Sequence, residues 1–327
     1  MTTSSMRART SATVAVVSAS AVVMTGCGEA AQSPGQEDEQ TGLTVVAGFY
    51  PLEWAAARVG GDRVDVSSLT PPGAEAHDLE LAPQDVAAIT EADLMVYLDG
   101  FQPALDEAAA SEAGDSAWDA GVAADLSLAA APHEDEDEEH ADEGTPEDEH
   151  ADEDAVDPHF WLDPVRLAAV GDALAERLTD LDPDGATTYE ENAVALRTDL
   201  EELDNEMQEG LADCGTDTLV TAHDAFGYLA DRYGFEVVGI SGLSPSQEPE
   251  PAQLAEITEL VSQREVTTVY TETLVDPAVA ETVAAEAGVQ TAVLDPLEGL
   301  TDESAGDDYL AVMRANLAAL QEGQSCS

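Results

Sequence analysis

Strand-like and helix-like patterns alternate in two separate parts of this chain. Short runs rich in β-branched residues are each followed by segments with apolar residues at helical spacing. The predicted strands are residues 43–51, 63–71, 94–100, 217–222, 235–240, 267–273 and 290–295. This alternation is typical of a parallel sheet covered by helices. The pattern therefore predicts an α/β fold with two halves.

The segment between the two halves has a different composition. From Pro164 to about Met207 the chain is rich in alanine, leucine, glutamate and arginine, with one interruption at LDPDG. We interpret this segment as one or two long helices that form a spine between the halves. We therefore expect an N-terminal lobe at 43–163, a linking spine at 164–212 and a C-terminal lobe at 213–327.

The N-terminus predicts export from the cytoplasm. Arg7 and Arg9 precede the apolar stretch SATVAVVSASAVVMTG, which is too short and too rich in small residues for a comfortable membrane span. VMTGC resembles a bacterial lipobox, although Met24 departs slightly from the usual aliphatic residue. We expect a signal peptide at 1–26, lipidation at Cys27 and a polar tether at 27–42. The alternative is an ordinary signal peptide with an incidental cysteine.

Charge and the remaining cysteines narrow the possible partners and the compartment. The chain has 70 acidic and 10 basic residues, for a net charge of −60. Such a surface repels phosphate backbones, so we expect no nucleic-acid partner.

After export, Cys214 and Cys326 are the cysteines that follow the anchor, and a disulfide between them is the simplest expectation.

Two histidines lie at the ends of predicted strands, and a third lies just beyond the acidic run. His77 lies in PPGAEAHDLE, His159 in VDPHFWLDP and His223 in LVTAHDAFGYL. Ligands bind at the carboxyl ends of strands in open α/β sheets, so these imidazoles can converge between the halves. A single loop histidine is more often a surface or capping residue, and the chain has no HExxH or CxxC motif. The residues alone leave a histidine-rich transition-metal site as a hypothesis.

Several motifs resemble one protein family. The segment FYPLEWAAARVGGDRVDVSSLTPPGAEAHDLE is similar to the first half of the zinc and manganese substrate-binding lipoproteins of bacterial ABC transporters. PHFWLDP, TAHDAFGYLADRYG and TAVLDPLEGL follow in the order that the family has, so the resemblance covers residues 43–320. It implies two lobes joined by a long rigid helix, with one metal ion held between them.

The resemblance also implies the ligands. It places His77, His159 and His223 on the metal, with Asp295 as the carboxylate from the second lobe. Some members carry a glutamate just before the first histidine, but this chain has Ala76 there, which leaves Asp295 or a water molecule as the fourth ligand. Manganese-binding members usually replace the third histidine by glutamate, so His223 favours Zn(II).

Two further features remain open. Glu272, in YTETLVDP, either supports the ligands from behind or is an exposed acid at a strand end. His133, His140 and His150 lie in an acidic insertion at 133–157, which has too few apolar residues to fold and is expected to be disordered. That insertion is either a weak zinc-collecting loop or a solvated acidic loop with incidental histidines.

The resulting functional expectation is a binding protein rather than an enzyme. We expect a monomeric lipoprotein, anchored to the cell membrane and facing outward, that captures Zn(II) and delivers it to an ABC permease. The alternatives are a manganese-binding member of the family, a surface adhesin that uses the same site and, less favoured, a zinc hydrolase. A hydrolase needs an open coordination position, which Asp295 would close.

Overall fold

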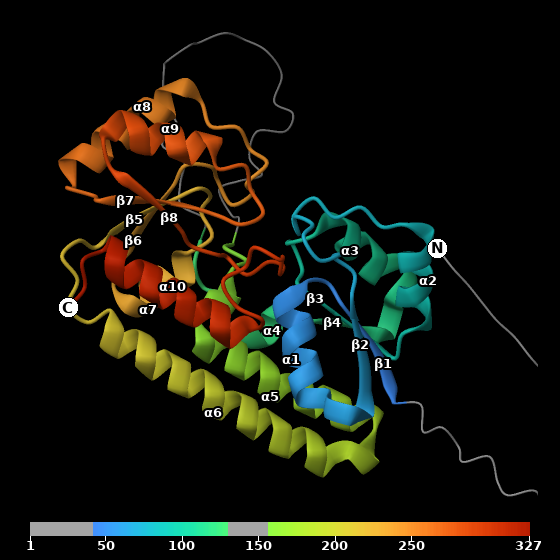
Figure 1. The fold of residues 1–327 in the computed structure, drawn as a ribbon. Coiled ribbons are helices and arrows are strands. Elements are labelled where there is room, and N and C mark those ends of the chain that lie inside the picture. Colours follow the sequence, from blue (N-terminus) through green and yellow to red (C-terminus); the bar gives the residue numbers. More distant parts are fainter. Residues whose placement is uncertain (1–41, 130–155) are drawn as a thin grey trace, which may run out of the picture. The chain divides into compact units, whose positions relative to one another are not determined.

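The computed structural model describes residues 42–129 and 156–327, in which the strands form two four-stranded parallel sheets (Figure 1). The first sheet has the strand order β2-β1-β3-β4, and the second has the order β6-β5-β7-β8, so the two halves share one topology. The strands of the first sheet are β1 (Leu43–Ala47), β2 (Val64–Ser68), β3 (Leu94–Tyr97) and β4 (Ala117–Asp119). Those of the second are β5 (Thr218–Thr221), β6 (Glu236–Gly239), β7 (Thr268–Thr271) and β8 (Gln290–Val293). The predicted α/β class with two mainly parallel sheets is confirmed.

Helices flank both sheets. In the N-terminal lobe they are α1 (Tyr50–Gly60), α2 (Pro83–Glu91), α3 (Pro103–Ala108) and α4 (Gly121–Ala124). In the C-terminal lobe they are α7 (Gly227–Tyr233), α8 (Pro251–Gln263), α9 (Ala278–Ala287) and α10 (Tyr309–Gly323). Figure 1 shows α8 and α9 on one face of the second sheet and α10 on the other.

Helices cover both faces of each sheet because successive strand residues point to opposite faces and both sets are apolar. In β5, Leu219 packs in the cluster that contains α7 and α10, while Val220 packs in the cluster that contains α8 and α9. In β1, Val45 and Val46 likewise belong to different clusters. Neighbouring strand residues point to opposite faces, so an apolar run buries both. Polar residues then collect where the strands end.

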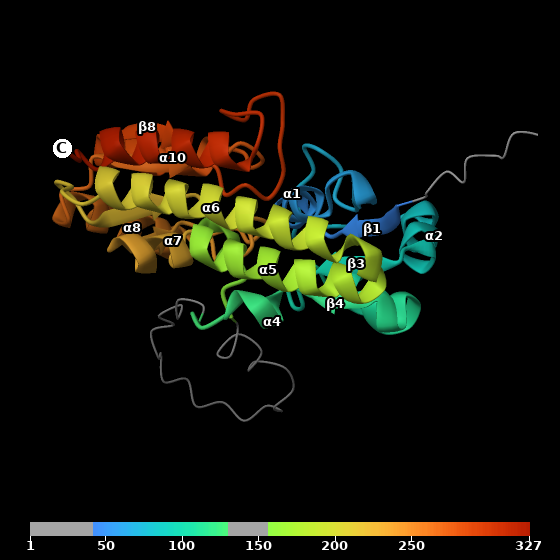
Figure 2. The ribbon, with the colours of Figure 1, turned by 90° about the horizontal axis from the view of Figure 1, so that it is seen from below.

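Two long helices connect the lobes, where the sequence predicted one or two. They are α5 (Pro164–Leu181) and α6 (Ala186–Gly210). Between them lies a 3-10 turn at Pro183–Gly185, within the predicted LDPDG interruption, because proline cannot continue the helical hydrogen bonding. Helix α6 packs against α5, α1 and α10, and Figure 2 shows it running along both lobes.

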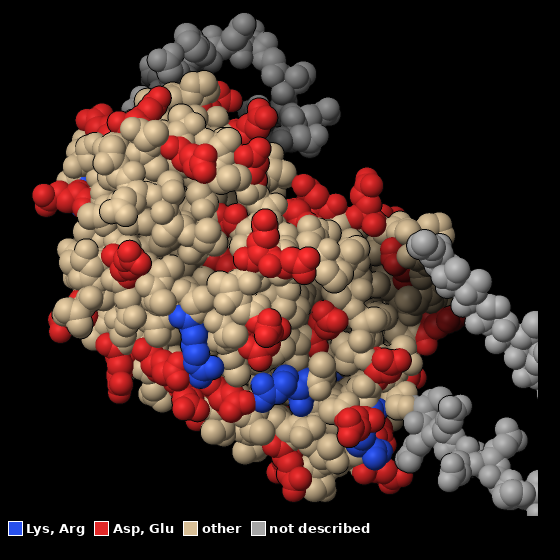
Figure 3. All heavy atoms as spheres, viewed as in Figure 1, with Lys and Arg blue, Asp and Glu red and all other residues tan. Residues whose placement is uncertain are grey.

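Arginines attach both lobes to α6. Arg58 of α1 pairs with Asp199 at 2.5 Å, and Arg314 of α10 pairs with Glu206 at 2.7 Å. Acidic side chains spread over the face seen in Figure 3, whereas the basic ones gather in a few places near its lower edge. These pairs are partly exposed, so each adds little stability.

The C-terminus is tied to the start of its lobe. Cys214 and Cys326 form the disulfide that the sequence predicts. No helix in the described part of the chain is both long and apolar enough to cross a membrane. The expected signal peptide, Cys27, the tether up to residue 41, and His133, His140 and His150 lie outside the described residues. The expected disordered insertion at 133–157 is wrong at its end, because Val156 forms a β-bridge with Ala129 and Asp157 is buried.

Candidate metal centre

His77 is presented by the long loop that follows β2. Its backbone N–H donates to Glu75 Oε1 at 3.0 Å, and the preceding carbonyl of Ala76 accepts from the Gln102 side chain at 2.9 Å. The Phe101 ring meets the imidazole edge-on, with centroids 4.5 Å apart. The loop thus has little regular structure, but the histidine is held on several sides, and its side chain is 8% exposed.

His159 lies in the segment just before α5. Asp157 Oδ1 accepts from the His159 backbone N–H at 2.9 Å and faces ring Nδ1 at 2.8 Å. The carboxylate oxygen accepts from Nδ1, so the neutral imidazole carries its proton there and presents the lone pair of Nε2 to the cluster. This arrangement fixes the tautomer that a metal needs at Nε2.

His223 is held in the same way by a different carboxylate. It lies two residues beyond β5, and Glu272 follows β7, the neighbouring strand. Glu272 Oε1 accepts from the His223 backbone N–H at 3.1 Å, and Oε2 faces ring Nδ1 at 2.7 Å. Of the two readings of Glu272, the structure therefore places it behind His223 rather than in solvent.

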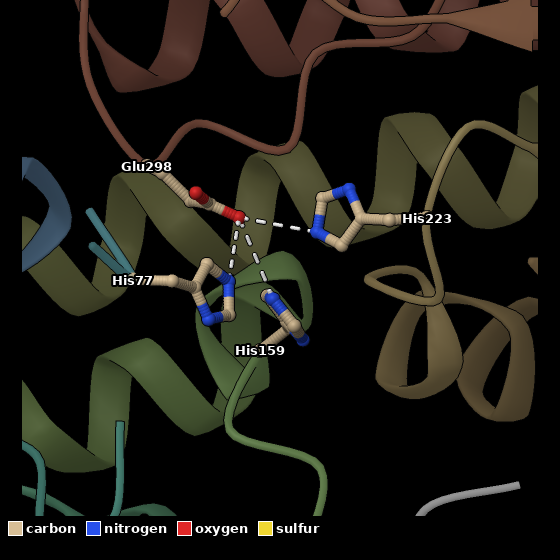
Figure 4. Close-up of side chains that lie close together, drawn as sticks. All are labelled: His77, His159, His223 and Glu298. Atoms are coloured by element: carbon tan, nitrogen blue, oxygen red, sulfur yellow. Dashed lines mark ion pairs between the residues drawn. The ribbon is translucent and has the colours of Figure 1, made fainter. Parts of the chain in front are cut away.

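A fourth side chain, Glu298, comes from the loop after β8. Its Oε1 atom lies 3.4 Å from Nε2 of His77, 3.5 Å from Nε2 of His159 and 3.3 Å from Nε2 of His223 (Figure 4). These four atoms are buried and have no hydrogen-bond partner among the described residues. We call this group the His3Glu cluster.

The spacing of these atoms fits a small tetrahedral ion. Bonds of about 2.0–2.1 Å to zinc put the corners of a tetrahedron about 3.3 Å apart. The contacts of Glu298 Oε1 are 3.3–3.5 Å, and all four donor atoms lie within 4.8 Å of one another. The distances from Glu298 Oε1 to the three imidazoles therefore match the edges of a zinc coordination shell.

The electrostatics of the His3Glu cluster favour a bound cation. Burial acts to raise the pKa of Glu298, but the three histidines outweigh it and hold that pKa well below its ordinary value. Burial lowers the pKa of His77. For His159 and His223 burial acts in the same direction, yet the carboxylates Asp157 and Glu272, together with Glu298, raise the net pKa. A buried carboxylate that stays ionised needs a positive charge beside it, which a proton or a metal ion can supply.

Asp295 is not part of the cluster, contrary to the sequence-based expectation. Its Oδ1 accepts from the backbone N–H of Leu297 at 2.8 Å, and its Oδ2 accepts from the Thr273 hydroxyl at 3.2 Å. Glu298, three residues later in DPLEG, reaches the position expected of Asp295. The motif contains both acids, but residue type alone does not tell which one the turn directs toward the histidines.

A protein-family model matches residues 45–323, nearly the whole described chain. Its description is "ZnuA: Zinc-uptake complex component A periplasmic". The chain is 36% identical over 308 residues to the zinc-binding lipoprotein AdcA of Streptococcus pneumoniae, a match that covers 92% of this chain and 58% of that protein. It is 33% identical over 309 residues to the high-affinity zinc uptake system protein ZnuA of Bacillus subtilis, covering 94% and 95%. The chain thus spans a little over half of the AdcA relative and almost all of the ZnuA relative.

Solved structures share the fold. The Zn(II)-bound structure of AdcA from Streptococcus pneumoniae is similar with a TM-score of 0.70 at 35% identity, covering 86% of this chain and 58% of that one. The laminin binding protein Lmb of Streptococcus agalactiae, described as a bifunctional protein with adhesin and metal transporting activity, gives a TM-score of 0.72 at 33% identity. That match covers 86% of this chain and 100% of that one.

Proposed function

Because this chain belongs to the zinc-uptake complex component A family, we propose that it captures one Zn(II) ion outside the cell membrane and delivers it to an ABC permease. The ion is cargo, held by His77, His159 and His223 from three separate loops and by Glu298 from a fourth. The observation that carries this proposal is the convergence of four buried donor atoms that lack any other partner in the described chain.

The donor set supports zinc over manganese. Three imidazole nitrogens and one carboxylate oxygen suit a tetrahedral d¹⁰ ion, whereas manganese prefers a larger shell rich in oxygen ligands. Copper, nickel and cobalt accept the same donors, and their exclusion depends on which metals are available outside the cell.

The same geometry supports a carrier rather than a hydrolase. A catalytic zinc keeps an open position for water or substrate, but the four protein donors complete a tetrahedral shell. Two acids lie close behind ligands. Glu272 uses both oxygens on His223, so it is not free to act as a base, and Asp157 is turned toward the backbone N–H and ring Nδ1 of His159.

The membrane anchor and the partner complete the proposal. A lipid on Cys27 and the tether at 27–42 would keep the protein at the outer face of the membrane, where a permease can take up the ion. A protein that meets its permease at the membrane surface can act as a monomer. The names of the AdcA and ZnuA relatives, a zinc-binding lipoprotein and a zinc uptake protein, agree with this location.

Zinc titration by calorimetry tests the proposal directly. We expect residues 28–327 to bind one Zn(II) tightly, and His223→Ala to lose this binding. His140→Ala is the matched control, because it removes a histidine that lies outside the His3Glu cluster, and it should keep the tight site. Absence of tight zinc binding in the wild-type protein would refute capture.

Delivery requires a second measurement. Uptake of radioactive zinc by the source bacterium should fall when the gene is deleted and recover with the wild-type gene. The His223→Ala gene should not restore it. Recovery with His223→Ala would separate uptake from this site and contradict the proposal.

A further inference from the structure

We propose that Asp295 is a positioning residue, whose carboxylate folds the turn 295–298 so that Glu298 reaches the three histidines. This inference rests on the proposed function, since it concerns how the zinc ligand Glu298 is placed. It also gives Asp295 a role other than that of a metal ligand.

The Asp295 carboxylate is fully used within its own surroundings. The residue is 2% exposed. Oδ1 accepts the backbone N–H of Leu297, two residues ahead, at 2.8 Å, which closes an Asx-type turn. Oδ2 accepts the hydroxyl of Thr273, in the loop after β7, at 3.2 Å. The side chain therefore ties the turn both to itself and to the neighbouring strand end.

The backbone of the turn is held from two other elements. Asn316 of α10 accepts from the Asp295 N–H at 2.9 Å and donates to the Asp295 carbonyl at 2.7 Å. Trp161, two residues after the ligand His159, donates its indole N–H to the Pro296 carbonyl at 2.7 Å. Pro296 has no N–H of its own to satisfy. Together with Thr273 after β7, contacts from three other segments thus converge on a four-residue turn.

Leu297 shows that the turn is under constraint. It is fully buried and has a φ of 62°, in the left-handed region that a leucine rarely adopts. Such a conformation persists only when the surroundings determine it, and the Asp295 carboxylate supplies the partner of the Leu297 N–H. The change of backbone direction at Leu297 lets Glu298 face the three histidines, while Asp295, three residues earlier, faces Thr273 and the turn itself.

Loss of the Asp295 carboxylate should therefore act on zinc through Glu298. Without it, the buried Leu297 N–H has no acceptor, and the left-handed turn has lost a restraint. Contacts of 3.3–3.5 Å between Glu298 Oε1 and three imidazoles tolerate little movement. Groups that orient ligands typically change metal affinity by about 10–100-fold when they are removed.

The test compares three variants by zinc competition with a chromophoric chelator. Asp295→Ala should weaken zinc binding by about 10–100-fold. Asp295→Asn should stay within about 3-fold of wild type, because an amide oxygen still accepts the Leu297 N–H and its NH2 group can donate to the Thr273 hydroxyl. Glu298→Gln, which removes the charge of a ligand, should lose more affinity than Asp295→Asn.

Cobalt(II) absorption separates positioning from coordination. A four-coordinate cobalt site absorbs visible light strongly, and the spectrum reports its ligands. Asp295→Asn should keep the wild-type spectrum, whereas Glu298→Gln should change it. The control is Asp276→Ala, which removes another aspartate that accepts an N–H two residues ahead, at the exposed start of α9. It should leave zinc affinity unchanged.

The outcomes separate the inference from the proposed function. A wild-type protein that binds no zinc would overturn capture itself. With wild-type binding intact, Asp295→Ala at wild-type affinity would overturn the positioning role. Asp295→Asn that loses as much affinity as Glu298→Gln, with an altered cobalt spectrum, would make Asp295 a ligand. Circular dichroism of each metal-free variant identifies misfolding, and in that case the Asp295→Asn result decides.

Discussion

Replacing Glu272 by glutamine should weaken zinc binding more at high pH than at low pH. Both Glu272 oxygens accept hydrogen bonds from His223, at 2.7 and 3.1 Å, and both side chains are buried. Glutamine has one acceptor oxygen, so the variant loses one of these bonds and the negative charge behind the imidazole. A less basic, less firmly oriented imidazole should bind zinc about 10–100-fold more weakly, which corresponds to about 1.4–2.7 kcal/mol.

The pH dependence follows from the pKa of His223. Burial lowers this pKa, but the Glu272 charge is the largest of the causes that raise it, and the net shift is well upward. Zinc must displace the proton, so wild-type affinity falls as the pH drops through that raised pKa. In Glu272→Gln the pKa is lower, and proton competition begins at lower pH. The two affinities should therefore converge as the pH falls.

Chelator competition at about pH 8.5 and about pH 6 measures this convergence, since histidines titrate in that range. Glu256→Gln, an exposed change of the same kind on α8, is the control for the altered net charge and should follow the wild-type curve. A loss of affinity that is the same at both pH values, or that grows at low pH, would refute the proposed pairing of Glu272 with His223.

Three other outcomes are expected. Zinc at about 100 times its Kd should stabilise the fold by about 2.7 kcal/mol and raise Tm by roughly 5–10 °C. Scanning calorimetry measures this shift, and a chelator should reverse it. An unchanged Tm would contradict specific binding. Reduction of the Cys214–Cys326 disulfide, whose cysteines are 112 residues apart, should lower the free energy of unfolding by up to about 4.8 kcal/mol, because the unfolded chain regains the entropy of the open loop. The denaturant midpoint should fall accordingly. An unchanged midpoint would argue against a structural role for this bond. Deleting residues 133–155 should reduce affinity far less than His223→Ala does in zinc titrations, and equal losses would mean that the main site is misplaced.

Much of the fold could be predicted because it depends on local patterns. Apolar β-branched runs and amphipathic segments can be recognised from short stretches of sequence, and their alternation predicts parallel sheets with helices on both faces. The interruption at LDPDG ended α5 where proline and glycine end a helix. The short strand β4 and the short helices α3 and α4 were not predicted, since runs of three to six residues carry too little periodicity to recognise.

The three histidines of the candidate site were also accessible from the sequence. Each lies at the end of an apolar run or in a motif of the family, and strand ends of a parallel sheet meet at one edge. The structure brings all three together within one cluster.

The fourth donor was decided by tertiary structure. Asp295 and Glu298 are both acids within one short motif, and either could be a ligand by chemistry alone. The choice depends on the left-handed backbone at Leu297, on Asn316 from α10 and on Trp161 from the segment before α5. These contacts join residues far apart in the chain, so no local pattern records them.

The two carboxylates that contact the histidine rings, Asp157 and Glu272, differ in how far they lie from their histidines in the sequence. Asp157 is only two residues from His159, but it falls within the insertion that was expected from the sequence to be disordered, and the bond between them is seen only in the structure. Glu272 is 49 residues from His223, and they meet because β5 and β7 are neighbours in the sheet. The sequence by itself determined which residues are available for metal chemistry and which elements carry them. The tertiary structure decided which acid faces the three histidines and which acids hold those histidines in place, because that depends on strand order and on the direction of a single buried turn.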